Sequence, residues 1–264
     1  MTLDHLTIGY RSRHDTHIVA RDITAHLEAG CLTCLLGPNG AGKSTLMRTL
    51  AAFQPAISGT ISLDGRLLTD FPPNELATRI GVVLTERVDV RQLRVRDLVA
   101  MGRSPYTGFW GRLRPEDEAA IDEAIALTGI ANLAHRMAHT LSDGERQKTM
   151  IAKALAQQTP TILLDEPTAF LDFPSKAETM LLLARLAHEM NKTILISTHD
   201  LDLALQTADR LWLMGGQTLL IGTPRQLAAN GALPRFFAGP GIEFDAENLT
   251  FRISRGGTPP AKAQ

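Results

Sequence analysis

Several features common in other classes of protein are scarce in this sequence, and each shortage is informative. Two cysteines among 264 residues are too few for a disulfide framework or a four-thiolate zinc site. The 27 Lys and Arg are balanced by 28 Asp and Glu, so no basic field is available to hold nucleic acid. The longest apolar runs, such as residues 180–184, are far shorter than the about 20 residues of a transmembrane helix. Residues 1–10 lack the apolar core of a signal peptide, so we expect a soluble protein of a reducing compartment.

The two cysteines form a C-x-x-C pattern, which is also the spacing of redox pairs and metal clips. Cys31 and Cys34 lie in an apolar run, residues 31–36, that is typical of a buried strand. A spacing of three places them on opposite faces of such a strand. We therefore expect neither a redox pair nor a metal site here.

Short apolar runs alternate with amphipathic stretches along the chain. Strands are expected at 3–10, 18–27, 31–36, 60–63, 66–68, 80–84, 161–164, 193–197, 211–214 and 218–221. Helices are expected at 43–53, 176–190 and 201–208, and residues 87–158 look mainly helical. Strands that alternate with helices predict an α/β layer fold, and the central helical stretch predicts a subdomain inserted into it.

A glycine-rich segment, Gly37–Ser44, matches the pattern G-x-x-x-x-G-K-[ST] between an apolar strand and a helix. Glycines let the backbone curl so that several N–H groups point at one anion, and the helix N-terminus favours the same negative charge. Lys43 would contact the β and γ phosphates, and the Ser44 hydroxyl would bind Mg²⁺. The segment therefore predicts a phosphate-binding loop rather than a plain turn.

Three further segments place charged or capping residues at the ends of predicted elements. Asp165 and Glu166 end an apolar strand, where Asp165 can orient Mg²⁺ and Glu166 can take a proton from water. His199 ends another strand at the edge where α/β folds bind ligands. Ser142 with Glu145 forms an S-x-x-E capping box at a helix start. Taken alone, each has a structural explanation: a solvated strand end, a structural histidine or a helix cap.

In this order, the segments resemble the ATP-binding subunit of an ABC transporter from about residue 3 to residue 227. The resemblance implies a Walker A loop with ATP-binding residues Gly37, Pro38, Asn39, Gly40, Ala41, Gly42, Lys43, Ser44 and Thr45. It makes Asp165 and Ser44 the Mg²⁺ ligands, and Glu166 and the switch histidine His199 the catalytic residues. It also places Asp172 in the D-loop and has Tyr10 stack on adenine, although Tyr10 could instead pack within the sheet.

The resemblance implies a P-loop NTPase ABC cassette: a RecA-like α/β core with an N-terminal antiparallel β subdomain and an inserted helical subdomain. Residues 1–255 are then one ATP-binding domain. Its parts are the nucleotide-binding core at 1–84 and 160–227, the helical subdomain with the signature at 85–159, and a C-terminal extension at 228–255. Residues 256–264 are rich in Gly, Pro and Ala and are expected to form a disordered tail.

The same resemblance implies a head-to-tail homodimer that buries two ATP with Mg²⁺. Walker A of one copy would face Ser142 and Gly144 of the other, in the segment that stands at the ABC signature. It further implies two transmembrane permease subunits, an indirect link to a substrate-binding protein, and a peripheral position at the cytoplasmic face of the inner (plasma) membrane.

Residues 95–108 look like the branch that imports iron chelates (siderophores), haem or cobalamin. The alternative is a soluble ABC ATPase acting on DNA or ribosomes, which the single cassette and balanced charge disfavour. A module that binds nucleotide without hydrolysis is disfavoured by Glu166 and His199.

Two positions depart from the family pattern. The usual signature is L-S-G-G-Q, and here Asp143 and Glu145 replace Gly and Gln. Because carboxylates repel the γ-phosphate, we expect Asp143 to point away from the nucleotide. The family has Gln, a Mg²⁺ sensor, where this chain has Thr85 followed by Glu86. Either Thr85 acts through a water, or Glu86 takes over, or coupling to the permease is looser.

Residues 79–114 have an excess of five positive charges, since they contain eight arginines and three acidic residues. The arginines are Arg79, Arg87, Arg91, Arg94, Arg96, Arg103, Arg112 and Arg114. Three aromatic residues lie in a Gly/Pro loop of this segment: Tyr106, Phe109 and Trp110. We interpret the segment as a docking surface for a membrane subunit and anionic headgroups rather than a solvated face. His135 and His139 have the i,i+4 spacing of metal ligands, but a polar loop is the preferred interpretation.

Overall fold

The structure is a computed structural model that describes residues 1–12, 15–84, 92–108, 110–239 and 241–253. Its N-terminal part is a four-stranded antiparallel sheet in the order β2-β1-β4-β5. The strands are β1 (Thr2–Arg11), β2 (Thr16–His26), β4 (Ser58–Leu63) and β5 (Arg66–Leu67). One face carries buried apolar residues and the other faces solvent, as expected of an antiparallel sheet.

A six-stranded sheet in the order β10-β9-β3-β8-β7-β6 forms the centre of the molecule. Its strands are β3 (Leu32–Leu36), β6 (Ile80–Val83), β7 (Thr161–Asp165), β8 (Thr193–Ser197), β9 (Arg210–Gly215) and β10 (Thr218–Gly222). All pairs are parallel except β9 with β10. Strands β3, β7 and β8 are buried throughout, because both faces of the parallel sheet are covered. Their carboxyl ends therefore meet at one edge.

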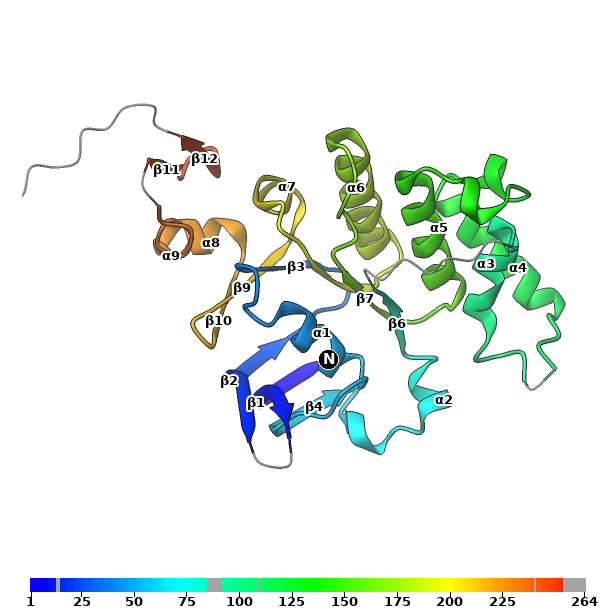
Figure 1. Cartoon of the computed structure of the whole chain (residues 1–264), viewed down its shortest axis with the longest axis horizontal. Coiled ribbons are helices and arrows are strands. Elements are labelled where there is room, and N and C mark those ends of the chain that lie inside the picture. The colour runs from blue at the N-terminus through cyan, green and yellow to red at the C-terminus, as the bar shows by residue number, and fades with distance from the viewer. Residues whose placement is uncertain (13–14, 85–91, 109, 240, 254–264) are drawn as a thin grey trace, which may run out of the picture.

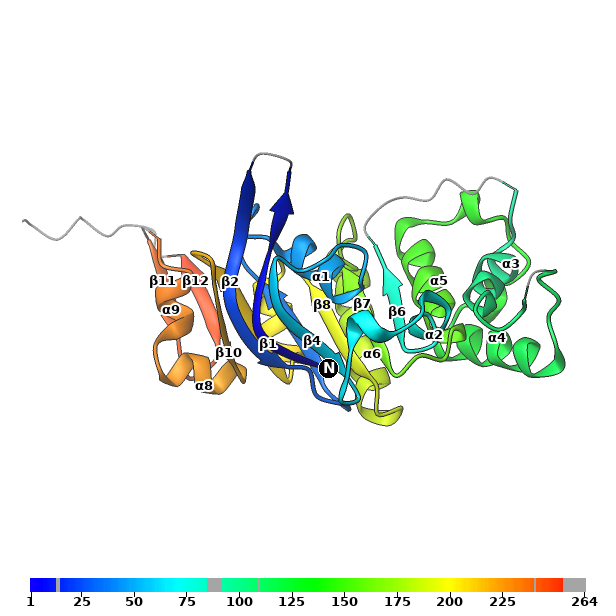
Figure 2. The ribbon, with the colours of Figure 1, turned by 90° about the horizontal axis from the view of Figure 1, so that it is seen from below.

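Two apolar clusters hold the layers together, one on each face of the six-stranded sheet. Helix α1 (Lys43–Leu50) lies between this sheet and the antiparallel sheet, as Figures 1 and 2 show. The opposite face packs against α6 (Phe173–Glu189) and α7 (Leu201–Thr207). Two short elements, η1 (Leu68–Asp70) and α2 (Pro73–Leu76), connect β5 to β6.

The segment between β6 and β7 forms a helical unit at one end of the molecule (Figure 1). Its α-helices are α3 (Val95–Ala100), α4 (Pro115–Leu127) and α5 (Asp143–Ala156). Short 3-10 helices separate them: η2 (Met101–Arg103), η3 (Ala131–Leu133) and η4 (Ala138–Thr140). At the other end stand α8 (Pro224–Ala229), α9 (Ala232–Phe236) and the hairpin β11 (Ile242–Asp245) with β12 (Thr250–Ile253).

Several details differ from the sequence expectations. The helix after the glycine loop ends at Leu50 rather than near residue 53, because Ala52 adopts a left-handed φ of 58°. The strand predicted from residue 31 begins at Leu32, so Cys31 precedes it, and its thiol lies 3.8 Å from Glu28 Oε2. Both thiols are free, and burial raises the pKa of Cys31 and of Cys34. A raised thiol pKa lowers the fraction of reactive thiolate.

Two expectations concern the membrane and the chain end. Among the described residues, no helix combines the length and the apolar character that crossing a bilayer requires. The tail expected at residues 256–264 lies outside the described residues.

Candidate functional site

The glycine loop joins the end of β3 to the start of α1, at the carboxyl edge of the six-stranded sheet. At two positions of this loop neighbouring atoms leave no room for a side chain, so only glycine fits. A Cβ on Gly37 would lie 2.2 Å from the backbone oxygen of Met214, and a Cβ on Gly42 would lie 2.0 Å from Val19 Cγ1. Gly42 also has a φ of 102°, which side chains rarely adopt. The close packing of β2 and β9 around the loop therefore fixes its path.

Lys43 is the first residue of α1, and only 6% of it is exposed. Its Nζ donates hydrogen bonds to the carbonyl oxygens of Gly37 at 2.8 Å and Pro38 at 3.2 Å. The pKa of Lys43 is lowered, because the effect of burial outweighs the opposing effect of the nearby Glu166 and Asp165 carboxylates. A cation held against the loop by its own carbonyls, at a helix N-terminus, is well placed to bind an anion.

Asp165 ends β7 beside Ser197, the last residue of β8, and the two are paired in register. The Ser197 hydroxyl donates a 2.6 Å hydrogen bond to Asp165 Oδ1 and accepts one of 2.9 Å from the Glu166 N–H. One hydroxyl thus holds both acidic residues. Sequence reasoning assigned Ser197 no role. The available signal was its position at the end of a predicted strand, two residues before His199.

Glu166 and His199 meet at the same edge, as the sequence predicted from their strands. His199 Nε2 lies 2.5 Å from Glu166 Oε1. Glu166 adopts a left-handed φ of 51°, so the backbone turns sharply straight after β7 and directs this side chain away from the strand. The imidazole fixes one carboxylate oxygen, and the other can accept a proton from water.

Ser44 is exposed next to Lys43, and Asp165 is 8% exposed. A hydroxyl and a carboxylate are oxygen donors of the kind Mg²⁺ prefers, and that ion is usually completed by phosphates and water rather than by a full protein cage. The described residues contain no cluster of three His, Cys, Asp or Glu with metal-binding geometry. The donor set therefore fits Mg²⁺ together with a polyphosphate.

Tyr10 stands near the end of β1, and its hydroxyl lies 2.8 Å from Thr45 Oγ1 on α1. The residue is 52% exposed. Base stacking by Tyr10 and packing of Tyr10 within the sheet both stay predictions. Its ring is held beside the glycine loop with much of its surface open, as stacking on a base requires.

The segment at the signature position has the capping box that the sequence predicted. The Glu145 N–H donates to Ser142 Oγ at 3.3 Å, and the Ser142 N–H donates to Glu145 Oε2 at 2.9 Å. Asp172 caps α6 by accepting a hydrogen bond from the Ser175 N–H. A Cβ on Gly144 would lie 3.3 Å from Ser175 Oγ, so the starts of α5 and α6 are adjacent. In both Figure 1 and Figure 2, α5 stands apart from α1.

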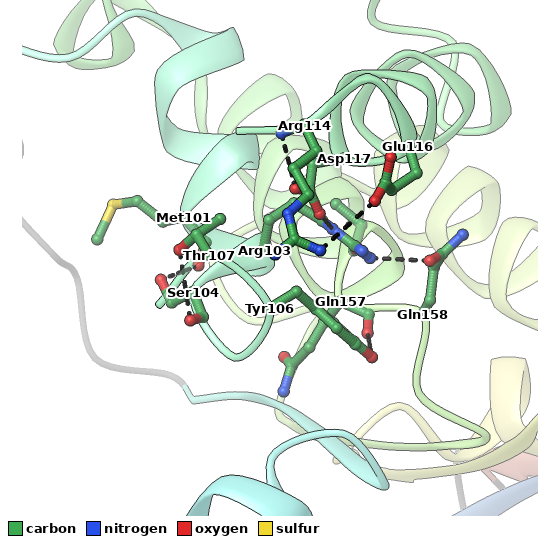
Figure 3. Close-up of polar contacts among 11 residues, drawn as sticks. Met101, Arg103, Ser104, Tyr106, Thr107, Arg114, Glu116, Asp117, Gln157 and Gln158 are labelled. Atoms are coloured by element: carbon green, nitrogen blue, oxygen red, sulfur yellow. Dashed lines mark hydrogen bonds and ion pairs between the residues drawn. The ribbon is translucent and has the colours of Figure 1, made fainter. Parts of the chain in front are cut away.

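Two members of the expected docking surface pack inward instead: Arg103 is buried and Tyr106 is half-buried. The Arg103 side chain is 5% exposed, and its Nε donates to Asp117 Oδ1 at 2.8 Å (Figure 3). Its Nη1 donates to Ala156 O and Gln158 Oε1, both at 2.8 Å. Tyr106 stacks on this guanidinium at 4.0 Å and donates from its hydroxyl to Gln157 O. Within the helical unit, Arg103 and Tyr106 therefore join the segment after α3 to α4 and to the end of α5.

The rest of the arginine-rich segment is mixed. Arg96 pairs with Glu118 and Asp122 on α4, whereas Trp110 is 82% exposed. Arg87, Arg91 and Phe109 lie outside the described residues, as do Thr85 and Glu86. Docking through the exposed members stays a prediction, and so does each alternative for Thr85.

Comparison with known proteins agrees with this geometry. The family model for the ABC transporter matches residues 20–169, more than half of the chain. An ABC transporter ATP-binding protein of Methanocaldococcus jannaschii is 42% identical over 80% of this chain and 71% of its own length. The ferric enterobactin transport ATP-binding protein of Escherichia coli K12 is 36% identical over 89% of this chain and 85% of its own.

Among solved structures, a chain of a metal-chelate type ABC transporter in an inward-facing conformation superposes with a TM-score of 0.78. It is 26% identical, and the match covers 96% of this chain and 95% of that one. The chain therefore belongs to the ABC transporter family and is one of its ATP-binding subunits, which hydrolyse ATP.

Proposed function

We propose that this chain couples ATP binding and hydrolysis to uptake of a metal chelate through a membrane permease. The observation that carries the proposal is the meeting of Lys43, Asp165 and Glu166 at one edge of the parallel sheet, with His199 bonded to Glu166. That set holds a cation for phosphate, an oxygen ligand for a metal ion, and a base for water. The ferric enterobactin relative and the metal-chelate structure support the kind of cargo.

Each residue has a part in the proposed hydrolysis. The loop N–H groups and Lys43 hold the β and γ phosphates, and Tyr10 stacks on the adenine. Ser44 and Asp165 would hold Mg²⁺, which would supply positive charge next to the phosphates. Glu166 accepts a proton from the attacking water, and His199 holds Glu166 in place.

A second copy of the chain completes the site. The Ser142 hydroxyl and the Gly144 N–H lie at the start of α5, which stands apart from α1 within one chain. A two-fold arrangement would place them on the partner's γ-phosphate and would create two equal sites. Phe170 and Phe173, which are 74% and 68% exposed, flank Asp172 and would be covered in such a dimer.

The permease would dock beside β6, the strand that leads to Thr85. A hollow of about 760 Å³ lies there, and its lining includes Phe53, Leu67 and Phe71. Phe53 is 60% exposed and Leu67 is 41% exposed, so apolar surface is available to a cytoplasmic segment of a permease. Contact with two permeases would keep the chain at the cytoplasmic face of the membrane and link it indirectly to a substrate-binding protein. The permease and that protein, not this chain, would select the siderophore, haem or cobalamin.

The docking proposal can be tested by coexpression with the neighbouring permease. Phe53→Arg should abolish copurification with the permease, because a charge replaces apolar contact area, while ATP binding is retained. Leu220→Arg, at a 45% exposed position on β10, is the matched control and should copurify normally. Normal copurification of the Phe53 variant would place the permease elsewhere.

The ATPase proposal can be tested with two variants. Glu166→Gln should retain Mg-ATP, form an ATP-dependent dimer in size-exclusion chromatography, and lose hydrolysis. Lys43→Ala should lose nucleotide retention and dimer formation together. Equal ATP retention by wild type and Lys43→Ala would overturn the proposal. Purified dimer that acts without any membrane partner, on DNA or ribosomes, would favour the alternative that the comparisons do not support.

A further inference from the structure

Arg136 ties the beginning of α5 to the loop that precedes it. Its Nη1 donates to Glu145 Oε1 at 3.1 Å, and its Nη2 donates to Thr140 O at 2.7 Å. The two nitrogens of one guanidinium thus hold a residue in the first turn of α5 and a residue at the end of η4. This planar, two-pronged contact fixes direction as well as charge.

The carboxylate that Arg136 holds is itself a bridge to Ser142. Glu145 Oε1 accepts from Arg136, while Glu145 Oε2 accepts from the Ser142 N–H at 2.9 Å. The Ser142 N–H and the Arg136 guanidinium both lower the pKa of Glu145, so this side chain is ionised at neutral pH. A negative charge therefore sits within the first turn of α5, beside Ser142 and Gly144.

The backbone of Arg136 is anchored to a different helix. Its carbonyl oxygen accepts a 2.9 Å hydrogen bond from the N–H of Val95, the first residue of α3. The next residue, Met137, pairs with Arg94 in an isolated antiparallel bridge. Because its main chain is fixed to the start of α3, the guanidinium meets Glu145 from a defined position.

The charge at Glu145 matters only when a triphosphate approaches. If Ser142 and Gly144 contact the partner's ATP, as proposed above, then Glu145 places a carboxylate near a highly anionic ligand, where the family pattern has a neutral Gln. Like charges at such separations repel, and more strongly once water is excluded from an interface. The Arg136 cation, 3.1 Å from Glu145 Oε1, offsets this repulsion.

We propose that Arg136 is a positioning residue for the ATP-bound dimer: it neutralises Glu145 and holds Ser142 in the orientation that meets the partner's triphosphate. This inference rests on the proposed function. In the isolated chain the Arg136–Glu145 ion pair lies at the surface, since these side chains are 43% and 31% exposed. Surface ion pairs add little to the free energy of unfolding. We therefore expect the Arg136–Glu145 ion pair to stabilise the ATP-bound dimer, from which water is excluded, rather than the isolated chain.

A double-mutant cycle over Arg136→Ala and Glu145→Gln tests this. The readouts are KM and kcat for Mg-ATP hydrolysis, ATP-dependent dimer formation, and Tm. With Glu145 present, Arg136→Ala should raise KM and the dimer dissociation constant by about tenfold with no loss of Tm. In the Glu145→Gln background the same change should alter KM less than about twofold. Arg136→Lys keeps the positive charge, so it should raise KM and the dimer dissociation constant less than Arg136→Ala does.

Arg185→Ala removes a comparable arginine contact, to Leu127 O, far from α5's start and should leave every readout unchanged. Equal losses from Arg136→Ala in both backgrounds would make Arg136 merely structural and overturn the proposal, as would no loss in either. If Lys43→Ala still retains ATP, the proposed function fails instead, so the two failures are distinguishable.

Discussion

Ser197 donates a 2.6 Å hydrogen bond from its hydroxyl to Asp165 Oδ1, across two neighbouring parallel strands. The same hydroxyl accepts from the N–H of Glu166, whose side chain meets His199. One small side chain therefore orients both Asp165, the proposed Mg²⁺ ligand, and the backbone of Glu166, the proposed base. Ser197 itself need not touch the nucleotide to influence the reaction.

Replacing Ser197 with Ala should impair hydrolysis without unfolding the protein. The change removes a hydrogen bond to a charged group, which is worth about 1.5–3 kcal/mol, so kcat should fall about tenfold or more. Because Asp165 loses its fixed orientation, the Mg²⁺ concentration for half-maximal rate should rise as well. Steady-state ATPase assays over a Mg²⁺ titration measure both. Ser62→Ala on β4 is the control, and an unchanged Mg²⁺ response in Ser197→Ala would contradict the role.

Tyr10 should contribute binding energy through its ring rather than its hydroxyl. Stacking of a base on an aromatic ring is worth about 1–3 kcal/mol, so Tyr10→Ala should raise the Kd for ATP about fivefold or more. Tyr10→Phe keeps the ring and loses only the contact with Thr45 Oγ1, so its Kd should stay within about twofold. Binding of a fluorescent ATP analogue distinguishes the two. Equal losses in both variants would assign the effect to the Thr45 contact instead.

The parts of the site that the sequence predicted are those written in short, contiguous patterns. The loop at Gly37–Ser44, the capping box of Ser142, and the strand ends at Asp165 and His199 are all local signals. Parallel pairing of neighbouring strands then brings the strand ends to one edge without further information. Fold class and site location could therefore be predicted from the sequence.

The contacts that could not be predicted join residues far apart in sequence. Arg103 reads as one of eight arginines in a basic segment, yet it is buried against Asp117 and the end of α5. Nothing local distinguishes it from the exposed members, because burial depends on how α4 and α5 pack. The hairpin β11–β12 was likewise not predicted, since its short strands are stabilised by phenylalanines that meet only after folding, such as Phe237 with Phe251.

Removing one partner of the Arg103–Asp117 pair should destabilise the protein strongly. Arg103→Met keeps much of the side-chain volume but leaves the carboxylate of Asp117 buried without its cation, which should cost about 3–5 kcal/mol. The double variant Arg103→Met with Asp117→Leu leaves no charge behind and should recover part of this loss. Urea unfolding measures both. A double variant no more stable than Arg103→Met would show that packing, rather than charge, dominates the site.

Acid should weaken the same cluster in a defined direction. The backbone N–H of Arg114, opposed by burial and helped by the guanidinium of Arg103, lowers the pKa of Asp117 from its ordinary value of 3.8. The stabilisation from ionised Asp117 is therefore fully present above pH 3.8 and is lost as pH falls through the lower, folded-state value.

Asp117→Asn carries no such charge, so the difference in unfolding free energy between wild type and this variant should be constant above pH 3.8 and should shrink below it. Comparing the two proteins cancels most of the titration of other carboxylates, such as Asp122, whose pKa is lowered by hydrogen bonding to Arg96. A difference that stays constant, or grows, as the pH is lowered would show that Asp117 is not held as an ion by these contacts.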